Sequence, residues 1–382
     1  MKILYIANIR LPTEKAHGIQ IMKMCEAFAD LGYGVELVVP WRFNWIKTEP
    51  FEYYGVKKNF KITRLPSLDL VKFGRIGFLA QSASFAESAS WYTLFKKTDI
   101  IYSRDELPLF CLSFFKRNLF WEAHDGRLNF IIKNIIKRCA GIITITEGLK
   151  DFYARNGTAR EKIFVAPDGV DLEKFTINLN KEECRERFSL PQNKKIIMYT
   201  GHLYDWKGSD ILLETAREFE SKNSESESLF VFVGGTKKDI EIFKSKAESV
   251  KLSNIKILGH KPHYDIPYYL KAADVLVLPN RGDNDISRRY TSPMKLFEYM
   301  ASGNPIVASD LPSIREILNE TNAVLVKPDD SKELADGVIK VLRDDDLSGK
   351  ISKQALEDIK EYTWQKRADK IISFIKNCIK VK

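Results

Sequence analysis

The feature that most constrains the fold is a regular alternation of short, β-branched or apolar runs with longer amphipathic stretches along all 382 residues. Such alternation is typical of βαβ units, in which parallel strands are joined by helices that cover the sheet. The runs fall into two series, so two sheets are predicted. The first series covers residues 3–7, 35–39, 62–65, 100–103, 120–123, 142–145 and 163–166, and the second covers 196–199, 229–233, 255–258, 275–278, 306–308 and 323–326.

A short segment between the two series predicts a domain boundary. Residues 166–171 read Ala-Pro-Asp-Gly-Val-Asp, and their proline and glycine suit the interior of neither a strand nor a helix. The chain is also longer than one hydrophobic core normally supports. We therefore expect an α/β protein with two Rossmann-like, doubly wound parallel-sheet domains, covering residues 1–170 and 171–363. In such sheets, ligands bind beyond the carboxyl ends of the strands.

Composition excludes several classes of protein. Hydrophobic residues make up 44% and charged residues 29%, which is ordinary for a globular protein with a large core. No apolar run reaches the ~18 residues that cross a bilayer, and Arg10 and Pro12 interrupt the first run before a secretory core could form. We expect a cytoplasmic protein. Disulfides and structural zinc are not expected, because the five cysteines are scattered and form no paired motif: Cys25, Cys111, Cys139, Cys184 and Cys378.

The positive charge is concentrated in the first half of the chain. The net charge is +9, and residues 1–170 contain 25 Lys+Arg against 17 Asp+Glu. This asymmetry favours an anionic partner such as a phospholipid surface or a phosphorylated acceptor, although solvated lysines explain it equally well. Aromatic and basic residues alternate in segments 41–47 and 72–78, as on peripheral membrane surfaces, but core packing or contact between domains would also explain them. No motif for nucleic-acid recognition is present.

Two positions in the first domain could contact a ligand. Gly18 lies where a helix begins after the first strand, so it could let a phosphate or sugar approach the helix amides, or it could be a structural turn. His124 follows a buried strand and is a candidate active-site residue, although a lone histidine is more often structural. Arg104 and Asp105 end the preceding strand, where an ion pair at a helix start is the favoured interpretation. A GxGxxG motif is absent, which counts against a dinucleotide-dependent oxidoreductase.

The second domain begins with a strand, a glycine turn and a lysine just before a helix. Residues 199–208 read Tyr-Thr-Gly-His-Leu-Tyr-Asp-Trp-Lys-Gly. This order can bring the ammonium group of Lys207 to a diphosphate, with Gly208 leaving the start of the helix open. It is not a Walker motif, and alone it would more often be an exposed turn.

Residues 288–308 carry the most informative segment. Pro293 suits the first turn of a helix, and Ser292 could cap that helix. Unpaired amides at this end, with the helix dipole, would bind a diphosphate, and Glu298 one turn further could accept hydrogen bonds from ribose hydroxyls. An ordinary capped helix with Glu298 paired to a lysine is the alternative. The amides expected to be free belong to Met294, Lys295 and Leu296.

Taken together, these segments resemble the retaining glycosyltransferases of family 4, over nearly the whole chain. Gly201 to Gly208 is similar to the family's G-R-L-x-x-x-K-G element, with His202 in place of arginine, and Tyr290 to Glu298 is similar to its E-x7-E element, with Tyr290 in place of the first glutamate. Weaker similarities lie at residues 165–171, 272–279 and 362–364.

The resemblance implies a GT-B fold, in which two Rossmann-like domains face each other across a cleft and the last helix, here 364–382, crosses back to the first domain. It implies that Lys207 and His202 bind the donor diphosphate, that Gly201 belongs to the same element, that Glu298 binds the ribose, and that His124 lies near the transferred sugar. Because the family's first glutamate usually contacts that sugar, Tyr290 leaves the identity of the sugar open.

The expected reaction moves a sugar from a UDP- or GDP-sugar to a hydroxyl of a glycan or lipid-linked acceptor, with retention of configuration, as in polysaccharide biosynthesis. Fixed cations and helix amides would stabilise the departing diphosphate, so no metal or other cofactor is expected. The sequence Asp-Asn-Asp at 283–285 has the spacing of a metal-binding pair, but a solvated turn is favoured. Attachment to the inner face of the cell membrane is a further expectation. The alternatives are another GT-B enzyme, such as a nucleotide-sugar epimerase or a glycan phosphorylase, and a non-catalytic carbohydrate-binding protein.

Overall fold

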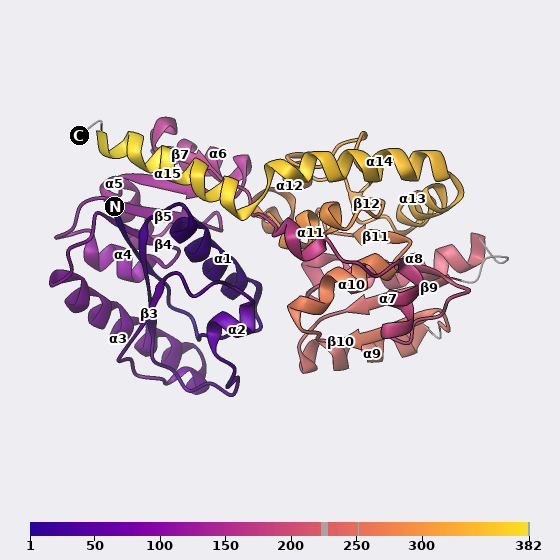
Figure 1. Cartoon of the computed structure of the whole chain (residues 1–382), viewed down its shortest axis with the longest axis horizontal. Helices are drawn as coiled ribbons and strands as arrows, with labels where there is room; N and C mark the ends of the chain where they lie inside the picture. Colours follow the sequence, from indigo (N-terminus) through magenta and orange to yellow (C-terminus); the bar gives the residue numbers. More distant parts are fainter. Residues whose placement is uncertain (223–227, 251, 381–382) are drawn as a thin grey trace. The chain divides into compact units, whose positions relative to one another are not determined.

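The computed structural model describes residues 1–222, 228–250 and 252–380, and the chain divides into two compact units (Figure 1). The first unit contains residues 1–168 and the segment from Trp364 onward, and the second contains Gly169–Thr363. The boundary therefore lies inside the Pro-Asp-Gly segment. The predicted last helix is α15 (Trp364–Lys380), and residues 381–382 lie outside the described part of the chain.

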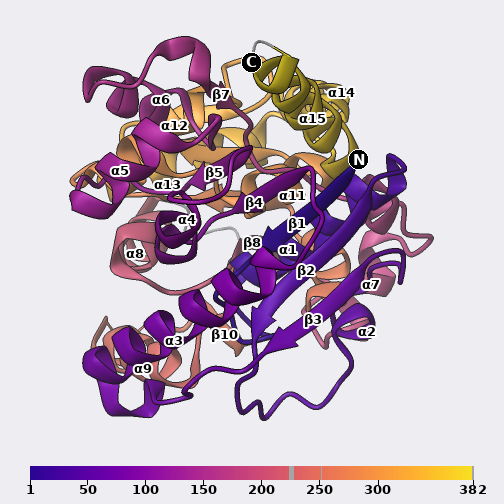
Figure 2. The same cartoon turned by 90° about the vertical axis from the view of Figure 1, so that its left-hand side faces the viewer.

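The first unit is built on a seven-stranded sheet in which every neighbouring pair of strands is parallel. Its order is β3-β2-β1-β4-β5-β6-β7, and Figure 2 shows β1, β2 and β3 running side by side. The order reverses between β1 and β4, which is the switch point of a doubly wound sheet. The strands are β1 (Lys2–Ile6), β2 (Gly34–Pro40), β3 (Lys61–Leu65), β4 (Ile100–Ser103), β5 (Leu119–Ala123), β6 (Gly141–Thr144) and β7 (Ile163–Val165).

Helices connect these strands, because parallel neighbours need a crossover. Among them α3, α4 and α5 contact one another in sequence, whereas α1 contacts α15 from the far end of the chain. The ring of Phe374 on α15 stacks on that of Phe164 in β7, with ring centroids 5.3 Å apart, so α15 completes the first unit. The helices are α1 (Ala16–Asp30), α2 (Pro50–Tyr54), α3 (Gly74–Leu94), α4 (Glu106–Leu112), α5 (Phe130–Arg138) and α6 (Glu147–Arg155), with short turns at Val71–Phe73 and Arg160–Lys162.

The second unit has a six-stranded parallel sheet of order β10-β9-β8-β11-β12-β13, with its switch point between β8 and β11. Its strands are β8 (Lys195–Thr200), β9 (Ser228–Val233), β10 (Ile255–Gly259), β11 (Val275–Leu278), β12 (Ile306–Ser309) and β13 (Val324–Val326). Its helices are α7 (Lys181–Arg187), α8 (Ser209–Lys222), α9 (Lys237–Val250), α10 (Ile266–Ala272), α11 (Met294–Ser302), α12 (Pro312–Arg315), α13 (Ser331–Arg343) and α14 (Asp345–Asp358). Short helical turns cover Leu172–Phe175, Asp205–Lys207, His263–Asp265, Ile286–Tyr290 and Ile359–Glu361.

Both faces of this second sheet are buried, each in its own hydrophobic core. Alternate residues of β8 enter different cores: Ile196 and Met198 pack with α10 and α11, whereas Ile197 and Tyr199 pack with α8 and α13. This explains why the strands read as continuous apolar runs in the sequence, because a parallel sheet covered on both faces has no solvent-facing side.

The structure confirms the predicted α/β class and all thirteen predicted strands, with ends that differ by no more than one residue. Among the described residues, none of the five cysteines forms a disulfide. Among the described residues, no helix has the length and apolarity needed to span a bilayer.

Candidate functional site

The predicted donor residues of the second unit lie at its switch point. Loop 201–208 follows β8, and the segment from Pro279 to Pro293 follows β11 and leads into α11. The hydroxyl of Tyr299 on α11 accepts a hydrogen bond from the amide of Thr200 at the end of β8, at 2.8 Å. A Cβ atom on Gly201 would lie 3.8 Å from the side chain of Lys295. The loop and the amino end of α11 therefore lie on the same side of the sheet edge.

Lys295 is a buried lysine whose amino group has no acceptor among the described residues. Only 7% of the residue is exposed, and its ammonium group has no hydrogen-bond partner within the part of the chain that the structure describes. Its Nζ atom lies 3.7 Å from the centre of the Tyr199 ring, which offers only the attraction of an aromatic face. Burial and the positive charge of Lys207 hold the pKa of Lys295 well below its usual range, although Glu298 acts in the opposite direction. A neighbouring anion would relieve this cost.

Lys207 is the second cation of this site. Burial lowers its pKa to about 8. Its Nζ atom lies 5.5 Å from the ring centre of Tyr204 and 5.2 Å from that of Trp206, and none of the described carboxylates is within ion-pair distance. The following Gly208 has a left-handed φ of +71°, and a Cβ atom there would lie 1.6 Å from the carbonyl oxygen of Pro279. Gly208 is therefore required by this close contact with the segment after β11, which the sequence analysis did not foresee.

The start of α11 differs in three details from the prediction. The first helical residue is Met294, so Pro293 occupies the N-cap rather than the first helical position, and Ser292 lies one residue before the N-cap. The amide of Leu296 is not free, because it donates to the carbonyl oxygen of Pro293 at 2.8 Å. This bond forms because Pro293 is extended and turns its carbonyl group toward the first turn of the helix. Among the described residues, no acceptor is found for the amides of Met294 and Lys295.

Glu298 is one turn further along α11, and its partner is a histidine rather than a lysine. The Nε2 atom of His263 lies 2.7 Å from a carboxylate oxygen of Glu298, whose side chain is 10% exposed. His263 belongs to the turn after β10, so a third loop of this sheet edge reaches α11. One carboxylate oxygen is thereby held, and the other can still accept hydrogen bonds.

The remaining predicted positions of this unit lie around the same loops. The ring of His202 stacks on that of Tyr204, with centroids 5.0 Å apart, and its Nδ1 atom lies 4.0 Å from Asp239. Tyr290 ends the helical turn Ile286–Tyr290, next to Thr291 and Ser292. The Asp-Asn-Asp sequence at 283–285 is a turn in which Asn284 accepts from the Ser287 amide. Among the described residues, no cluster of His, Cys, Asp and Glu side chains could hold a metal ion.

Gly18 has a packing role in the first unit. It lies inside α1 rather than ahead of it, and its amide donates to the carbonyl oxygen of Lys15 at 3.0 Å. A Cβ atom at this position would lie 2.3 Å from the hydroxyl of Tyr54 and 2.7 Å from a methyl group of Thr13. The Gly18 amide is therefore occupied, and the absence of a side chain makes room for Tyr54.

His124 follows β5, as predicted, and joins a buried polar cluster around Glu122. Its Nε2 atom lies 2.8 Å from Oε1 of Glu122, whose side chain is completely buried, while the His124 side chain remains 21% exposed. Burial and the positive charge of Arg104 lower the pKa of His124 to about 4, although Glu122 opposes this. His124 is therefore a neutral imidazole at physiological pH.

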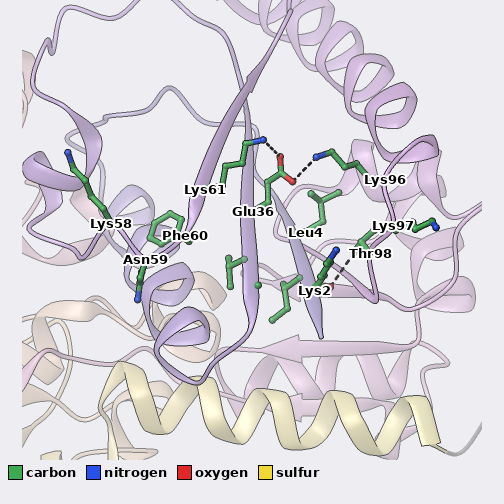
Figure 3. Close-up of a pocket in the computed structure, with 13 residues that line it drawn as sticks. Lys2, Leu4, Glu36, Lys58, Asn59, Phe60, Lys61, Lys96, Lys97 and Thr98 are labelled. Carbon is green, nitrogen blue, oxygen red and sulfur yellow. Dashed lines mark hydrogen bonds and ion pairs between the residues drawn. The ribbon is translucent and has the colours of Figure 1, made fainter.

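A separate hollow lies at the opposite end of the first sheet. Its volume is about 780 Å³, and it is lined by the amino ends of β1, β2 and β3 (Figure 3). Lys61 and Lys96 reach Glu36 inside it, at 3.6 and 3.1 Å. Burial would raise the pKa of Glu36, but hydrogen bonds from Thr63, Tyr92 and Lys96 lower it to about 2. Because ligands of parallel sheets bind at the carboxyl ends, this hollow is not the donor site.

The buried partners of the predicted residues were not predicted from the sequence. His263 follows a proline in a polar loop, and Arg367 lies on the last helix, 245 residues after its partner Glu122. Neither residue belongs to a local motif. Glu122 did carry a signal, since it is a charged residue inside an otherwise apolar strand, where a carboxylate must be paired.

Comparisons with known proteins agree with this arrangement. Residues 180–358 match the model of the family described as glycosyl transferases group 1. The matched region includes the strands of the second sheet, the Lys207 loop and α11.

Curated proteins that are similar to this chain carry glycosyltransferase names. A D-inositol 3-phosphate glycosyltransferase of Corynebacterium jeikeium is 24% identical over 60% of this chain and 55% of its own length. The UDP-Gal:alpha-D-GlcNAc-diphosphoundecaprenol alpha-1,3-galactosyltransferase of Escherichia coli is 28% identical over 55% of this chain and 53% of its own length. The chain thus spans about half the length of these curated relatives.

Similarity to solved structures extends over both units. The Anabaena protein HepE, solved with UDP and glucose, has a TM-score of 0.77 and 17% identity, with 99% of this chain and 100% of that chain covered. Together with the two parallel sheets, this likeness shows the GT-B fold, with two Rossmann-like domains.

Proposed function

We propose that this protein is a glycosyltransferase that moves a sugar from a nucleoside diphosphate sugar to an acceptor hydroxyl. The observation that carries this proposal is the buried ammonium group of Lys295, which has no hydrogen-bond partner among the described residues and lies near a second cation, Lys207. Two lysine side chains lie beside the amides of Met294 and Lys295, which have no acceptor among the described residues. Such a site binds an anionic diphosphate more strongly than it binds a neutral ligand.

The proposed chemistry depends on the departure of the diphosphate. As the bond to the sugar breaks, negative charge grows on the phosphate oxygen that leaves. Lys207, Lys295 and the amides of α11 are fixed around this position and need not reorganise, which is the condition for electrostatic catalysis. Glu298, held by His263, would accept hydrogen bonds from the ribose, and His202 would contact the diphosphate.

The first unit would supply the contact to the transferred sugar. His124 lies at the carboxyl end of β5, near the switch point, with part of its ring exposed. We propose that it positions the sugar rather than attacking it. Retention of configuration is proposed from the resemblance to family 4. Transfer to a glycan or lipid-linked acceptor, as in polysaccharide biosynthesis, is supported by the diphosphoundecaprenol in the name of the E. coli relative.

UDP is the proposed nucleotide of the donor. HepE was solved with UDP and glucose, and the name of the E. coli relative specifies UDP-Gal. A metal-independent reaction is proposed, because two lysines can neutralise the two charges of a diphosphate ester. We expect turnover to persist in excess EDTA; complete loss of turnover, restored by Mg²⁺ or Mn²⁺, would contradict this part of the proposal.

A membrane-facing role is proposed for one surface of the first unit, formed by residues 41–47 and 68–79. Asp69 ties the two segments together, since its carboxylate accepts from the Arg42 side chain at 3.0 Å and from the Phe43 amide at 2.8 Å. Lys47 and Lys72 lie over neighbouring aromatic rings. Large apolar side chains more than half exposed in these segments are Trp41, Phe43, Trp45, Leu68, Phe73, Ile76 and Leu79. Apolar and basic groups together suit an anionic bilayer such as the inner face of the cell membrane.

Vesicle flotation tests this surface. We expect the protein to float with vesicles that contain anionic phospholipid, and a variant with Phe73→Glu and Ile76→Glu to remain unbound. The matched control is Phe95→Glu, since Phe95 is at least as exposed as Phe73 and Ile76 but lies outside both segments. Equal flotation of all three proteins, or flotation that does not depend on anionic lipid, would refute the membrane-facing role.

The transfer reaction is tested in two stages. A thermal-shift panel of UDP, GDP, ADP and their sugars identifies the donor, because a ligand that binds only the native state raises Tm. We expect UDP and a UDP-sugar to give the largest shifts. Incubation of that donor with candidate acceptors should then give a glycosylated product and UDP. Donor binding without transfer or hydrolysis across a broad set of acceptors would refute the proposed function and favour a carbohydrate-binding protein.

A further inference from the structure

Glu122 is a fully buried carboxylate that receives hydrogen bonds from four different elements. Its Oε1 atom is approached by Gln20 of α1, by Nε2 of His124 at 2.8 Å and by Arg367 of α15 at 2.9 Å, and its Oε2 atom accepts from the hydroxyl of Tyr102 in β4. Three of these groups converge on Oε1 and one on Oε2, and the Gln20 amide nitrogen and the Arg367 guanidinium group can only donate. This arrangement favours the ionised form of Glu122.

The charge of Glu122 is maintained by Arg367. Burial would raise the pKa of Glu122, but the guanidinium group of Arg367 and the hydrogen bond with His124 hold it well below its usual range. Arg367 in turn is fixed by the carbonyl oxygens of Pro167 and Ala166, at 2.8 and 3.1 Å. Thus α15 supplies the counter-ion for a carboxylate at the end of β5.

This arrangement determines which nitrogen of His124 carries the proton. A carboxylate can only accept, so Nε2 of His124 must be the donor in their 2.8 Å contact. In a neutral imidazole the other nitrogen, Nδ1, is then an acceptor. Among the described residues, no donor is found for Nδ1 of His124, and the ring is partly exposed.

We infer that Glu122 and Arg367 are positioning residues, which hold His124 as the neutral Nε2–H tautomer so that Nδ1 accepts a hydrogen bond from a hydroxyl group of the transferred sugar. The sugar contact rests on the proposed function, whereas the tautomer and its dependence on Arg367 do not. His124 then acts as a hydrogen-bond acceptor for the sugar hydroxyl and does not act as a general acid.

Neighbouring groups support the same assignment. Gln20 donates to Glu122 through its amide nitrogen, and its amide oxygen accepts from Arg104, so each of its groups has a complementary partner. The charged groups that act on His124 are Arg104 after β4, Glu122 on β5 and Arg367 on α15. Two of these three are cations, which disfavour a second proton on the imidazole ring.

Nitrogen NMR of histidine-labelled protein tests the inference without any need for activity. The chain has only five histidines, so His124→Gln identifies its signals. In the wild type we expect His124 to show the Nε2–H tautomer and to stay neutral down to about pH 5. Arg367→Met removes a cation beside the ring, so the pKa of His124 should rise by at least about one unit. Arg367→Lys keeps the charge and should stay close to the wild type.

Glu122→Gln gives a second, opposite prediction. It removes the anion that raises the pKa of His124, so protonation should move to still lower pH, and the preference for Nε2–H should be lost. If Arg367→Met fails to fold, Glu122→Gln still tests the effect on the pKa and tautomer of His124, and Arg367→Lys remains the control that keeps the positive charge. A wild-type Nδ1–H tautomer, or a His124 titration that neither Arg367→Met nor Glu122→Gln changes, would overturn the inference.

Activity measurements separate this inference from the proposed function. With the donor found by thermal shift, Arg367→Met should lower kcat at least about tenfold while the Kd for UDP stays within about twofold, and Arg367→Lys should restore most of kcat. An equal loss of kcat in Arg367→Met and Arg367→Lys, with unchanged tautomers, would refute the positioning role. If no sugar is transferred from any donor, the proposed function fails, yet the NMR result still decides the tautomer of His124.

Discussion

Lys295 shows how a binding site can be recognised from a residue that lacks a partner. A buried ammonium group without a hydrogen bond destabilises a fold, since burial normally requires pairing. The contact with the Tyr199 ring offsets only part of that cost. A fold retains such a group when a ligand supplies the missing anion, and Lys207 nearby implies a ligand with more than one negative charge.

Substitution of the donor-site residues tests their roles directly. We expect Lys207→Ala and Glu298→Ala each to lower kcat by about 10²–10³-fold, the usual effect of removing one fixed group that stabilises a transition state. Thermal unfolding should stay close to the wild type. Lys222→Ala is the control, since within the described part of the chain Lys222 pairs with Asp336 at the surface. Near-normal rates in both Lys207→Ala and Glu298→Ala would contradict the assignment.

The pKa of Lys207 gives the binding of UDP a defined pH dependence. The group is charged below about pH 8 in the unliganded protein, and a bound diphosphate raises its pKa, so binding takes up a proton above that pH. The Kd for UDP should therefore increase by up to about tenfold per pH unit from about pH 8 upward. Titration calorimetry between pH 7 and 9.5 measures this.

The matched variant for this titration is Lys207→Met, which should bind UDP more weakly and with a smaller pH dependence. Lys295 contributes in the same direction, because its pKa is also lowered. A wild-type affinity that is constant or increases between pH 8 and 9.5 would show that Lys207 does not contact the diphosphate.

At the scale of elements, the donor site depends on how closely two loops approach. The turn before α8 and the segment after β11 meet where Gly208 lies against the carbonyl group of Pro279. This contact keeps Lys207 on the same side of the sheet as α11. The site therefore needs a glycine for reasons of packing, in addition to any contact with a ligand.

Replacement of Gly208 should distort that approach. Gly208→Ala introduces a Cβ atom 1.6 Å from a backbone oxygen, at a φ of +71°, so we expect a loss of at least about 2 kcal/mol of stability and weaker UDP binding. Gly349→Ala is the control, because Gly349 lies in α14 with no atom within 4 Å of the added Cβ. It should gain about 0.5–1 kcal/mol. Urea denaturation measures both, and equal stability of the two variants would contradict this account.

At the scale of the whole molecule, the first unit is built from two segments that are far apart in the sequence. The first unit is completed by α15, whose buried face includes Ile371, Ile372 and Ile375. Arg367 on this helix also pairs with Glu122, so the last helix both packs on the first unit and stabilises its polar cluster. That the two domains face each other across a cleft stays a prediction.

Separate expression of the units tests this division. We expect a fragment of residues 169–363 to fold and to bind UDP with an affinity within about tenfold of the full chain, because both lysines, α11 and Glu298 belong to it. A fragment of residues 1–168 should remain largely unfolded until the peptide 364–382 is added. Circular dichroism and calorimetry measure these outcomes. A folded second fragment that fails to bind UDP would place part of the donor site elsewhere.

Much of the fold and part of the site could be predicted from the sequence alone. The thirteen strands were predictable because parallel strands covered on both faces are short apolar runs, and this pattern is local. The loop from Gly201 to Gly208 and the helix with Glu298 were predictable because their residues are consecutive in the chain. The start of α11 was predicted one residue early, since the choice between N-cap and first helical position depends on backbone angles.

Only the tertiary structure decided which groups share a buried environment. The partners of Glu122 come from β4, α1, α15 and the residue after β5, and the pair formed by His263 and Glu298 joins the turn after β10 to α11. Burial, pKa and tautomer depend on such long-range contacts, which no local pattern encodes. The sequence by itself determined the two sheets and the order of the loops, whereas folding determined which cations lack a partner and which histidine nitrogen can accept a hydrogen bond.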